Sequence, residues 1–359
     1  MTASHVPPFS RDLWQMLREE KRDILLYGMG NGADKLLAVL AERGIAVRGV
    51  FASDGFVRGH SFHGMRVRSF SEISLEYKEN ECVVLLAFGS SRPEVLSLFD
   101  RVAARYPLFV PDLPVCGSNL FDAAFYEAHE KEFDSARALF KTEESRTLFD
   151  LVLASKYSGE YALFDRAVSE KKAYDLLESF PIARMADLGA YNGDSAREAI
   201  ARKGTRFILA VEPDKRNFRK LSAWASEITD CELECANVAI SDEKGEALFD
   251  DSGNRNAGLC TGRAATTVST DTLDNLLHGR AVDYIKFDVE GAEAAALRGA
   301  AETIRAHRPA LRVALYHRPE DLFALPLHLT AICPDYDLHL VRERGCPAWD
   351  LDLIALPRK

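Results

Sequence analysis

The sequence predicts an α/β fold made of two doubly wound, Rossmann-like units, and three observations support it. Short apolar runs alternate with amphipathic helical patterns between residues 23 and 110, and again between residues 183 and 315. This alternation is typical of parallel βαβ units. The first strand of each series enters a glycine-containing turn, and a charged helical stretch separates the two series. A chain of 359 residues is also long enough for about two domains.

In the first series, strands are expected at residues 23–28, 46–51, 65–70, 82–88 and 108–110, and a helix at 33–43. The turn after the first strand contains Gly28, Gly30, Gly32 and Ala33, which approximates a nucleotide-binding turn, and Asp54 follows the second strand. A tight strand-to-helix turn alone would select the same glycines. Two interpretations therefore stay open, a bound nucleotide or nucleotide-sugar, and a structural or substrate-presenting unit.

The stretch from residue 123 to 180 is predicted to be a helical connector. Its aromatic residues, among them Phe133, Phe140, Phe149 and Phe164, recur at loose helical intervals, which indicates a buried core rather than a cofactor site. The predicted organisation is a Rossmann-like N-terminal domain over residues 1–122, the connector over 123–180, and a second α/β domain over 181–359.

In the second series, strands are expected at residues 183–188, 206–211, 233–240, 283–288 and 309–315, followed by a final pair at 337–341 and 352–356. Residues 245–270 are rich in Gly, Asn, Ser and Thr and are too many for a plain connection. They predict a hairpin or an active-site insertion.

The second series opens on a pattern that indicates a cofactor site. Its first strand ends in a loop that contains Asp187, Gly189, Ala190, Tyr191, Asn192 and Gly193. The glycines allow a ligand to approach the backbone, and the helix that follows offers free N–H groups. The next strand ends at Glu212 and Pro213, which places a carboxylate where the ribose of a nucleoside would lie.

This arrangement is shared by NAD sites and S-adenosylmethionine sites. The spacing here is G-x-x-x-G, without the G-x-G-x-x-G that admits a pyrophosphate. It therefore favours S-adenosylmethionine over a dinucleotide, with Asp187 available for the ammonium group of the cofactor.

The second half of the chain resembles the FkbM-type S-adenosylmethionine-dependent methyltransferases. The blocks that carry the resemblance are DLGAYNGDSA, AVEPD, ANVAISDEKG, DYIKFDVEGAE and LRGA. The resemblance implies a class I methyltransferase fold with a mostly parallel seven-stranded sheet, methyltransferase activity (EC 2.1.1) and S-adenosylmethionine as cofactor. It also implies that Asn237, Val238 and Ala239 flank the adenine and that Asp288 and Glu290 lie near the transferred methyl group.

The block VALYHRPEDLFALP also looks like part of this family, and it places His317 after the fifth strand. Asp187, Glu212, Asn237, Asp288 and His317 all lie at the carboxyl ends of predicted strands, where open α/β sheets bind their ligands. The catalytic candidates are thus His317, Asp288 and Glu290, with His317 as general base and Asp288 orienting the substrate.

The functional hypothesis is an O-methyltransferase that acts on a hydroxyl of a sugar, a glycan precursor or another small polar metabolite. An N-methyltransferase stays open, as does a non-catalytic nucleotide- or nucleotide-sugar-binding protein with a degenerate methyltransferase domain. No metal ligand is assigned, although a divalent ion held by Asp288, Glu290 and His317 is a further alternative.

The net charge of −10, from 45 basic and 55 acidic residues, disfavours nucleic acid and anionic membranes as partners. The first 25 residues contain no uninterrupted apolar segment of the signal-peptide type, and the seven scattered cysteines fit reduced thiols. We expect a cytoplasmic protein that binds a small molecule, and homo-oligomerisation stays open.

Overall fold

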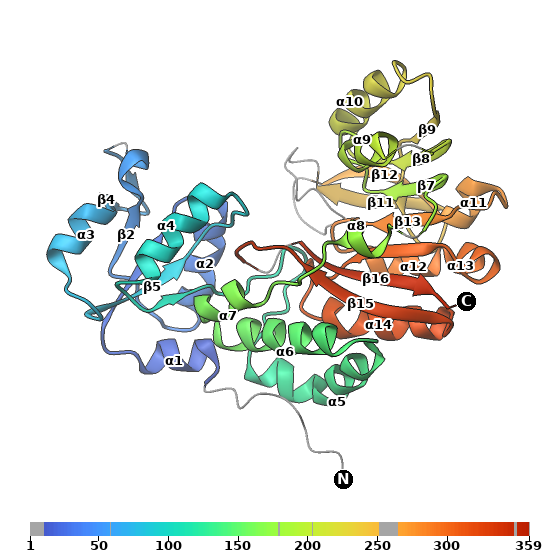
Figure 1. Cartoon of the computed structure of the whole chain (residues 1–359). Helices are drawn as coiled ribbons and strands as arrows, with labels where there is room; N and C mark the ends of the chain where they lie inside the picture. The colour runs from blue at the N-terminus through green and yellow to red at the C-terminus, as the bar shows by residue number, and fades with distance from the viewer. Residues whose placement is uncertain are drawn as a thin grey trace, which may run out of the picture.

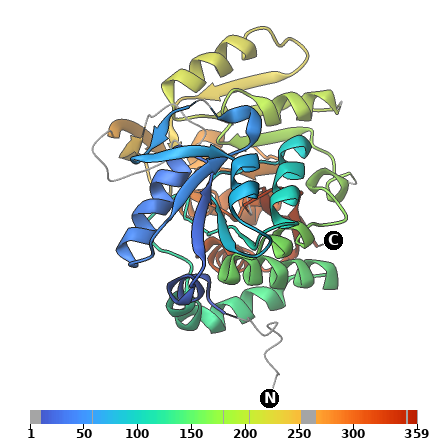
Figure 2. The same ribbon diagram turned by 90° about the vertical axis from the view of Figure 1, so that its left-hand side faces the viewer.

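The computed structural model describes residues 11–57, 59–178, 180–202, 204–250, 265–347 and 350–358. Two large β-sheets lie side by side, the N-terminal one in blue and cyan and the C-terminal one in yellow to red (Figure 1). Seen from the left-hand side, the N-terminal unit lies in front of the C-terminal one (Figure 2). The predicted α/β class is confirmed.

The first sheet has six strands, whose spatial order is β3 (Ser61–Phe62), β4 (Met65–Ser69), β2 (Gly49–Ala52), β1 (Asp23–Tyr27), β5 (Cys82–Leu86) and β6 (Leu108–Phe109). All neighbours are parallel except β3 and β4. The helices of this unit are α1 (Leu13–Glu19), α2 (Asn31–Glu42), α3 (Phe70–Glu76) and α4 (Pro93–Ala103), with a 3-10 turn η1 (Asp54–Phe56). Alternate residues of β1 face opposite sides, so Leu25 packs with α3 and α4 while Leu26 packs with α1 and α2.

The second sheet has seven strands, whose spatial order is β15 (Tyr336–Arg342), β16 (Leu351–Pro357), β14 (Ala310–Ala314), β13 (Tyr284–Phe287), β7 (Arg184–Leu188), β8 (Phe207–Val211) and β9 (Glu232–Ala236). β16 is antiparallel to both of its neighbours, β14 and β15, and the other neighbouring pairs are parallel. Its helices are α9 (Asp194–Ala201), α10 (Lys215–Ala225), α11 (Leu273–Leu277), α12 (Glu293–Arg298), α13 (Ala301–His307) and α14 (Asp321–Ile332). From β7 the chain first builds outward through β8 and β9 and then returns to β13 on the other side, which creates a switch point between β7 and β13.

Four helices connect the two sheets: α5 (Ala123–Leu139), α6 (Glu143–Ser158), α7 (Tyr161–Arg166) and α8 (Ala173–Leu176). Phe133, Phe140 and Phe149 of this stretch are buried in the core beneath the second sheet, whereas Phe164 is buried in the core of the first. The prediction that these aromatic residues form core is confirmed. The stretch therefore contributes to both cores rather than standing apart from them.

The strand predicted over residues 233–240 is divided in the structure. β9 ends at Ala236, the chain turns at Asn237, and β10 (Ala239–Ile240) pairs with β12 (Ala265–Asp271) in a separate small sheet. β12 also pairs with β11 (Gly245–Asp250) in antiparallel fashion. This pairing confirms the hairpin alternative for residues 245–270, although residues 251–264 lie outside the described part of the chain.

All six described cysteines are free, while Cys260 lies outside the described residues. Among the helices that the structure describes, none combines the length and the apolar character needed to cross a bilayer.

Candidate active site

A cavity of about 590 Å³ opens at the carboxyl ends of the central strands of the second sheet. Its lining includes Gly189, Glu212 and Val238. It also includes Asp288 and Glu290, which follow β13. Residues Gly89, Ser90, Ser91, Arg92 and Val115 of the N-terminal part also contribute to the wall. The cavity thus lies at the switch point of the second sheet and is completed by the first unit.

The loop after β7 passes very close to the end of β13. Gly189 has φ +82°, and a Cβ atom there would lie 1.8 Å from the carbonyl oxygen of Asp288. A Cβ at Gly193, which has φ +88° and precedes α9, would lie 2.6 Å from the ring of Trp224. Only glycine fits these two positions, so the spacing that the sequence shows is needed for the loop itself. Between them, Tyr191 lines the cavity, while Ala190 is buried and Asn192 is outside the lining.

Glu212 connects this loop to the end of β8. Its Oε2 accepts a hydrogen bond from the Tyr191 backbone N–H at 2.8 Å, and its Oε1 accepts one from the Asp214 N–H at 2.9 Å. The side chain is mostly buried, and this burial raises the pKa of Glu212 to about 7. Each carboxylate oxygen has a further lone pair, so Glu212 can still accept hydrogen bonds from a ligand in the cavity.

The third predicted region lies at the turn after β9. The Asn237 side-chain amide donates to the backbone carbonyls of Glu212, at 2.8 Å, and Pro213, at 3.0 Å. Pro213, Val238 and Ala239 line the cavity, whereas Asn237 is outside the lining and holds the adjacent turn. Asn237 therefore holds the turn whose neighbouring residues line the cavity.

Asp187 is fully buried, and neither of its carboxylate oxygens has a hydrogen-bond partner in the described part of the chain. Burial raises the pKa of Asp187 to about 6. The Lys286 ammonium lies 3.8 Å from Asp187 Oδ1 and 3.1 Å from Asp288 Oδ2. Burial lowers the pKa of Lys286, but the Asp288 and Asp187 carboxylates raise it more. Asp187 thus faces an ammonium group of the protein, and it has no exposed surface with which to meet the ammonium of a ligand.

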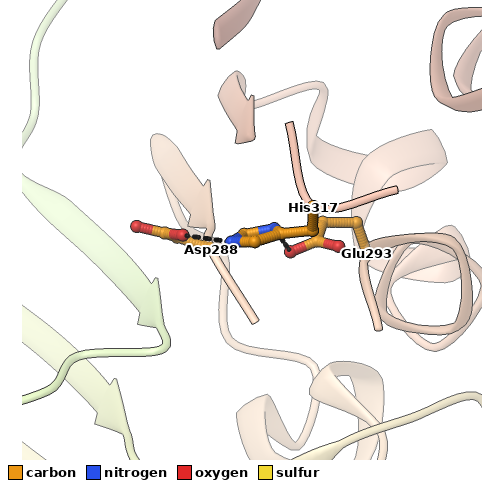
Figure 3. A group of neighbouring side chains, drawn as sticks. All are labelled: Asp288, Glu293 and His317. Atoms are coloured by element: carbon orange, nitrogen blue, oxygen red, sulfur yellow. Dashed lines mark ion pairs between the residues drawn. The ribbon is translucent and has the colours of Figure 1, made fainter. Parts of the chain in front are cut away.

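His317 lies fully buried between carboxylates, with Asp288 on one side of its ring and Glu293 on the other (Figure 3). Its Nδ1 is 2.9 Å from Glu293 Oε1, and its Nε2 is 3.3 Å from Glu290 Oε2 and 3.6 Å from Asp288 Oδ1. Burial lowers the pKa of His317, but Glu293 and Glu290 raise it well above its usual range. The raised pKa disfavours His317 as a proton acceptor, and its role as general base stays a prediction from the sequence.

Asp288 and Glu290 differ in their ability to take up a proton. Asp288 Oδ1 accepts a hydrogen bond from the Tyr316 hydroxyl at 3.2 Å. Burial raises the pKa of Asp288, but the charges of Lys286 and His317 lower it to about 2. For Glu290, burial dominates and raises the pKa. Of the two carboxylates that line the cavity here, Glu290 is the better proton acceptor.

The backbone around Glu290 is unusual. Glu290 has φ +53°, a conformation that is costly for a residue with a side chain and that clusters at functional sites. The Cys116 thiol donates to the Glu290 carbonyl at 2.9 Å, and the Cys116 N–H donates to the His317 carbonyl at 3.0 Å. The segment after β6 therefore holds both residues in place.

Several residues that line the cavity were not predicted from the sequence. Lys286 had a signal, because it is a charged residue in the middle of a strand whose other residues are buried and apolar. Arg312, within β14, and Tyr316, which follows that strand, also line the cavity. The contact of Ser90 with Cys346, formed by two backbone hydrogen bonds of 2.8 and 3.1 Å, has no local sequence signal.

The glycine turn of the first unit is filled by the protein itself. A Cβ at Gly28 would lie 2.4 Å from the Phe88 ring, and one at Gly32 would lie 2.4 Å from the Ala87 carbonyl oxygen. Asp54 accepts hydrogen bonds from the Ser71 N–H, at 2.9 Å, and from the Ser71 hydroxyl, at 3.0 Å. Packing thus accounts for these glycines, and Asp54 has a structural partner.

Comparison with known proteins gives a consistent result. Residues 187–339 match the methyltransferase FkbM domain. The methyltransferase FkbM of Methylobacillus flagellatus KT has a similar structure, with a TM-score of 0.72, 20% sequence identity, and coverage of 98% of this chain and 94% of that one. An rRNA methylase from Streptococcus thermophilus is more distant, with a TM-score of 0.36, 11% identity, and coverage of 54% of this chain and 100% of that one. No curated protein matches the sequence.

Proposed function

We propose that the chain is a methyltransferase of the FkbM type, which transfers a methyl group from S-adenosylmethionine to a hydroxyl of a small polar acceptor, such as a sugar or a glycan precursor. The observation that carries this proposal is one cavity with two kinds of lining residue. Glu212 can accept hydrogen bonds from a ribose, and the carboxylates of Asp288 and Glu290 line the same cavity.

The end of the cavity formed by β7, β8 and the turn after β9 suits the cofactor. Glu212 would accept hydrogen bonds from the ribose hydroxyls, and Val238 and Ala239 offer apolar surface for the adenine. The loop from Gly189 to Gly193 lies between them at the start of α9, whose free N–H groups favour a carboxylate. Among the residues predicted for this site, Asp187, Ala190, Asn192, Gly193 and Asn237 would act by shaping the loop and turn.

The part of the cavity that the first unit helps to line suits a polyhydroxylated methyl acceptor. It presents the Ser90 and Ser91 side chains, the Arg92 guanidinium and the Tyr316 hydroxyl, together with the Asp350 carboxylate. These groups offer both donors and acceptors of hydrogen bonds, as a sugar requires. The first unit contributes Ser90, Ser91 and Arg92 to this wall, which supports a role for it in presenting the acceptor.

The proposed reaction is an in-line displacement. The acceptor oxygen forms a bond to the methyl carbon, the carbon–sulfur bond breaks with its electron pair going to sulfur, and the hydroxyl proton goes to Glu290. Positioning of the two reactants would supply much of the rate, about 7–11 kcal/mol of the barrier. His317 would position Asp288 and Glu290, which its Nε2 faces at 3.6 and 3.3 Å, rather than remove the proton.

The test is methyl transfer measured against a panel of sugars and sugar nucleotides, with mass spectrometry to detect the gain of one CH₂ and its attachment to oxygen or nitrogen. In Glu290→Gln we expect the single-turnover rate to fall by about 10²–10⁴, the usual contribution of a positioned base. Affinity for S-adenosylmethionine, measured by calorimetry, should be unchanged.

Glu302→Gln is the matched control, because it removes the same charge from an exposed position on α13. Failure of S-adenosylmethionine to bind the wild type would overturn the proposed cofactor. A Glu290→Gln variant with the wild-type rate would overturn the role of Glu290.

A further inference from the structure

We propose that His317, Asp288 and Glu290 form a binding site for one divalent cation of the Mn²⁺ or Mg²⁺ type, at the acceptor end of the cavity. One ligand atom from each of Asp288, Glu293 and His317 lies within 4.8 Å of the others (Figure 3), and Glu290, which is not part of that group, lies 3.3 Å from His317 Nε2 through its Oε2. The distances to the two ring nitrogens show which carboxylates would bind the ion and which would orient the ring.

The Nε2 atom of His317 faces two carboxylate oxygens without bonding to either. Its distances to Glu290 and Asp288 are 3.3 and 3.6 Å, and within the described part of the chain it has no hydrogen-bond partner. A charge-assisted N–H···O hydrogen bond would be shorter, about 2.7–2.9 Å. By contrast, neighbouring ligands on an octahedral ion with bonds of about 2.1 Å lie about 3.0 Å apart. Both carboxylates would therefore have to move toward Nε2 to bring all three atoms onto one ion.

Glu293 has the position of an orienting residue. Its Oε1 lies at an ion-pair distance of 2.9 Å from Nδ1, the other ring nitrogen, and accepts a hydrogen bond from the Val289 N–H at 2.8 Å. A carboxylate on the far nitrogen fixes the ring so that Nε2 points at the ion, which is a common arrangement around metal-binding histidines. Both side chains are fully buried, so the ring is held rigidly.

The remaining carboxylates also have partners that fit this arrangement. Lys286, 3.1 Å from Asp288 Oδ2, leaves Oδ1 facing His317. Glu290 points its Oε2 at Nε2 from a backbone conformation with φ +53°. Carboxylates suit Mg²⁺ and Mn²⁺, and a single imidazole is well tolerated by Mn²⁺. Because Asp288 and Glu290 line the cavity, the open coordination positions would face the acceptor.

A cation at this place would bind the acceptor hydroxyl and lower its pKa, as divalent ions do for bound water. The oxygen would then attack the methyl group more readily, because the ion has already polarised its O–H bond. The proton would pass to Oε1 of Glu290. This catalytic role rests on the proposed function, but binding of the cation does not.

The test uses the full chain, freed of metal by chelation and titrated with Mn²⁺ in the absence of S-adenosylmethionine and acceptor. Electron paramagnetic resonance of free Mn²⁺ gives the stoichiometry and affinity, and we expect one ion per chain. Glu290→Gln should weaken binding at least tenfold, while the exposed Glu302→Gln should not. Glu293→Gln should weaken it about 10–100-fold, the usual effect of losing an orienting partner.

Pulsed electron paramagnetic resonance supplies a second readout, because an imidazole ligand couples its nitrogen nucleus to bound Mn²⁺. This signal should be present in the wild type and absent in His317→Gln. If His317→Gln does not fold, Glu290→Gln still tests the site, since its side chain is partly exposed. Absence of tight Mn²⁺ binding, equal binding by Glu290→Gln, or a wild-type spectrum without nitrogen coupling would each overturn the proposal. Calorimetry with S-adenosylmethionine on the same sample separates this outcome from failure of the proposed function.

Discussion

The two halves of the molecule contain the same local design, a strand, a glycine turn, a helix and a second strand followed by an acid, but they use it differently. In the first half, Phe88 packs against Gly28, and Asp54 is bound to Ser71. In the second half, Gly189 and Glu212 line a cavity. Glycines in such a turn therefore report a close backbone approach, and a ligand site requires in addition that the acid and the turn face open space.

The largest expected effect concerns the border between the two halves. The buried ammonium of Lys156 on α6 lies 3.0 Å from both carboxylate oxygens of Asp112, which precedes the connector. Phe121, also before the connector, is fully buried in the core of the second sheet. We therefore propose that the second unit begins before Asp112 rather than at residue 123.

Two fragments test this border, residues 111–359 and residues 123–359. The longer one should fold and bind S-adenosylmethionine. The shorter one should lose about 3–5 kcal/mol of stability, because removal of one partner leaves a buried charge unpaired. Urea denaturation followed by circular dichroism measures the difference. Equal stability of the two fragments would instead support a border at residue 123.

The second prediction compares glycines of the two turns. Gly189→Ala places a methyl group against the Asp288 carbonyl at a residue with φ +82°. Backbone strain and steric overlap should together cost about 3 kcal/mol of folding free energy and weaken cofactor binding. Gly30→Ala should cost only the strain, about 1–3 kcal/mol, because its φ is +114° and no atom lies within 4 Å of the added Cβ.

Denaturant titration measures the stability of both variants, and calorimetry measures their affinity for S-adenosylmethionine. The contrast fails if Gly30→Ala weakens cofactor binding as much as Gly189→Ala does, since the first turn would then be coupled to the site.

The third prediction compares the two acids. Glu212→Ala should weaken S-adenosylmethionine binding by about 1.5–3 kcal/mol, roughly 10- to 150-fold, because the ribose hydroxyls lose a charged acceptor. Asp54→Ala should leave the affinity unchanged, because Asp54 is engaged with Ser71 in the other unit. Calorimetry on both variants decides the matter. Equal affinities for wild type and Glu212→Ala would remove Glu212 from the ribose site.

The sequence was sufficient to predict most of the fold, because the strands are short apolar runs with clear ends. The exceptions follow from long-range contacts. The break in the strand predicted at residues 233–240 depends on the Asn237 amide, which donates to the backbone carbonyls of Glu212 and Pro213 after β8. The pairing of Ser90 with Cys346 joins segments that are remote in sequence. Neither contact leaves a local pattern.

The candidate site was predictable to the extent that polar residues follow strands. Glu212, Asp288 and Glu290 all line the cavity as expected. The proposed role of His317 could not be judged in this way, because its protonation depends on Glu293 and Glu290, whose side chains meet it only in three dimensions. Periodicity identifies which residues lie at a strand end, but not which charges surround them.

The smallest expected effect is the pH dependence of cofactor binding. The pKa of Glu212 is raised to about 7 by burial, so in the free protein this carboxyl is largely protonated at pH 6 and ionised at pH 8. Ribose hydroxyls donate best to the ionised form, and the affinity for S-adenosylmethionine should therefore rise up to about tenfold from pH 6 to pH 8.

The free energy of unfolding should respond to pH in the opposite sense. Between about pH 4.5 and 7 the folded chain holds a proton at Glu212 that the unfolded chain has lost, so the free energy of unfolding falls as pH rises through this window. Glu212→Gln cannot ionise, so it should lose the binding trend and show a smaller fall in the free energy of unfolding, to which Asp187 still contributes. Asp54→Asn should show both trends in full, and a Glu212→Gln variant that kept the binding trend would assign it to another group.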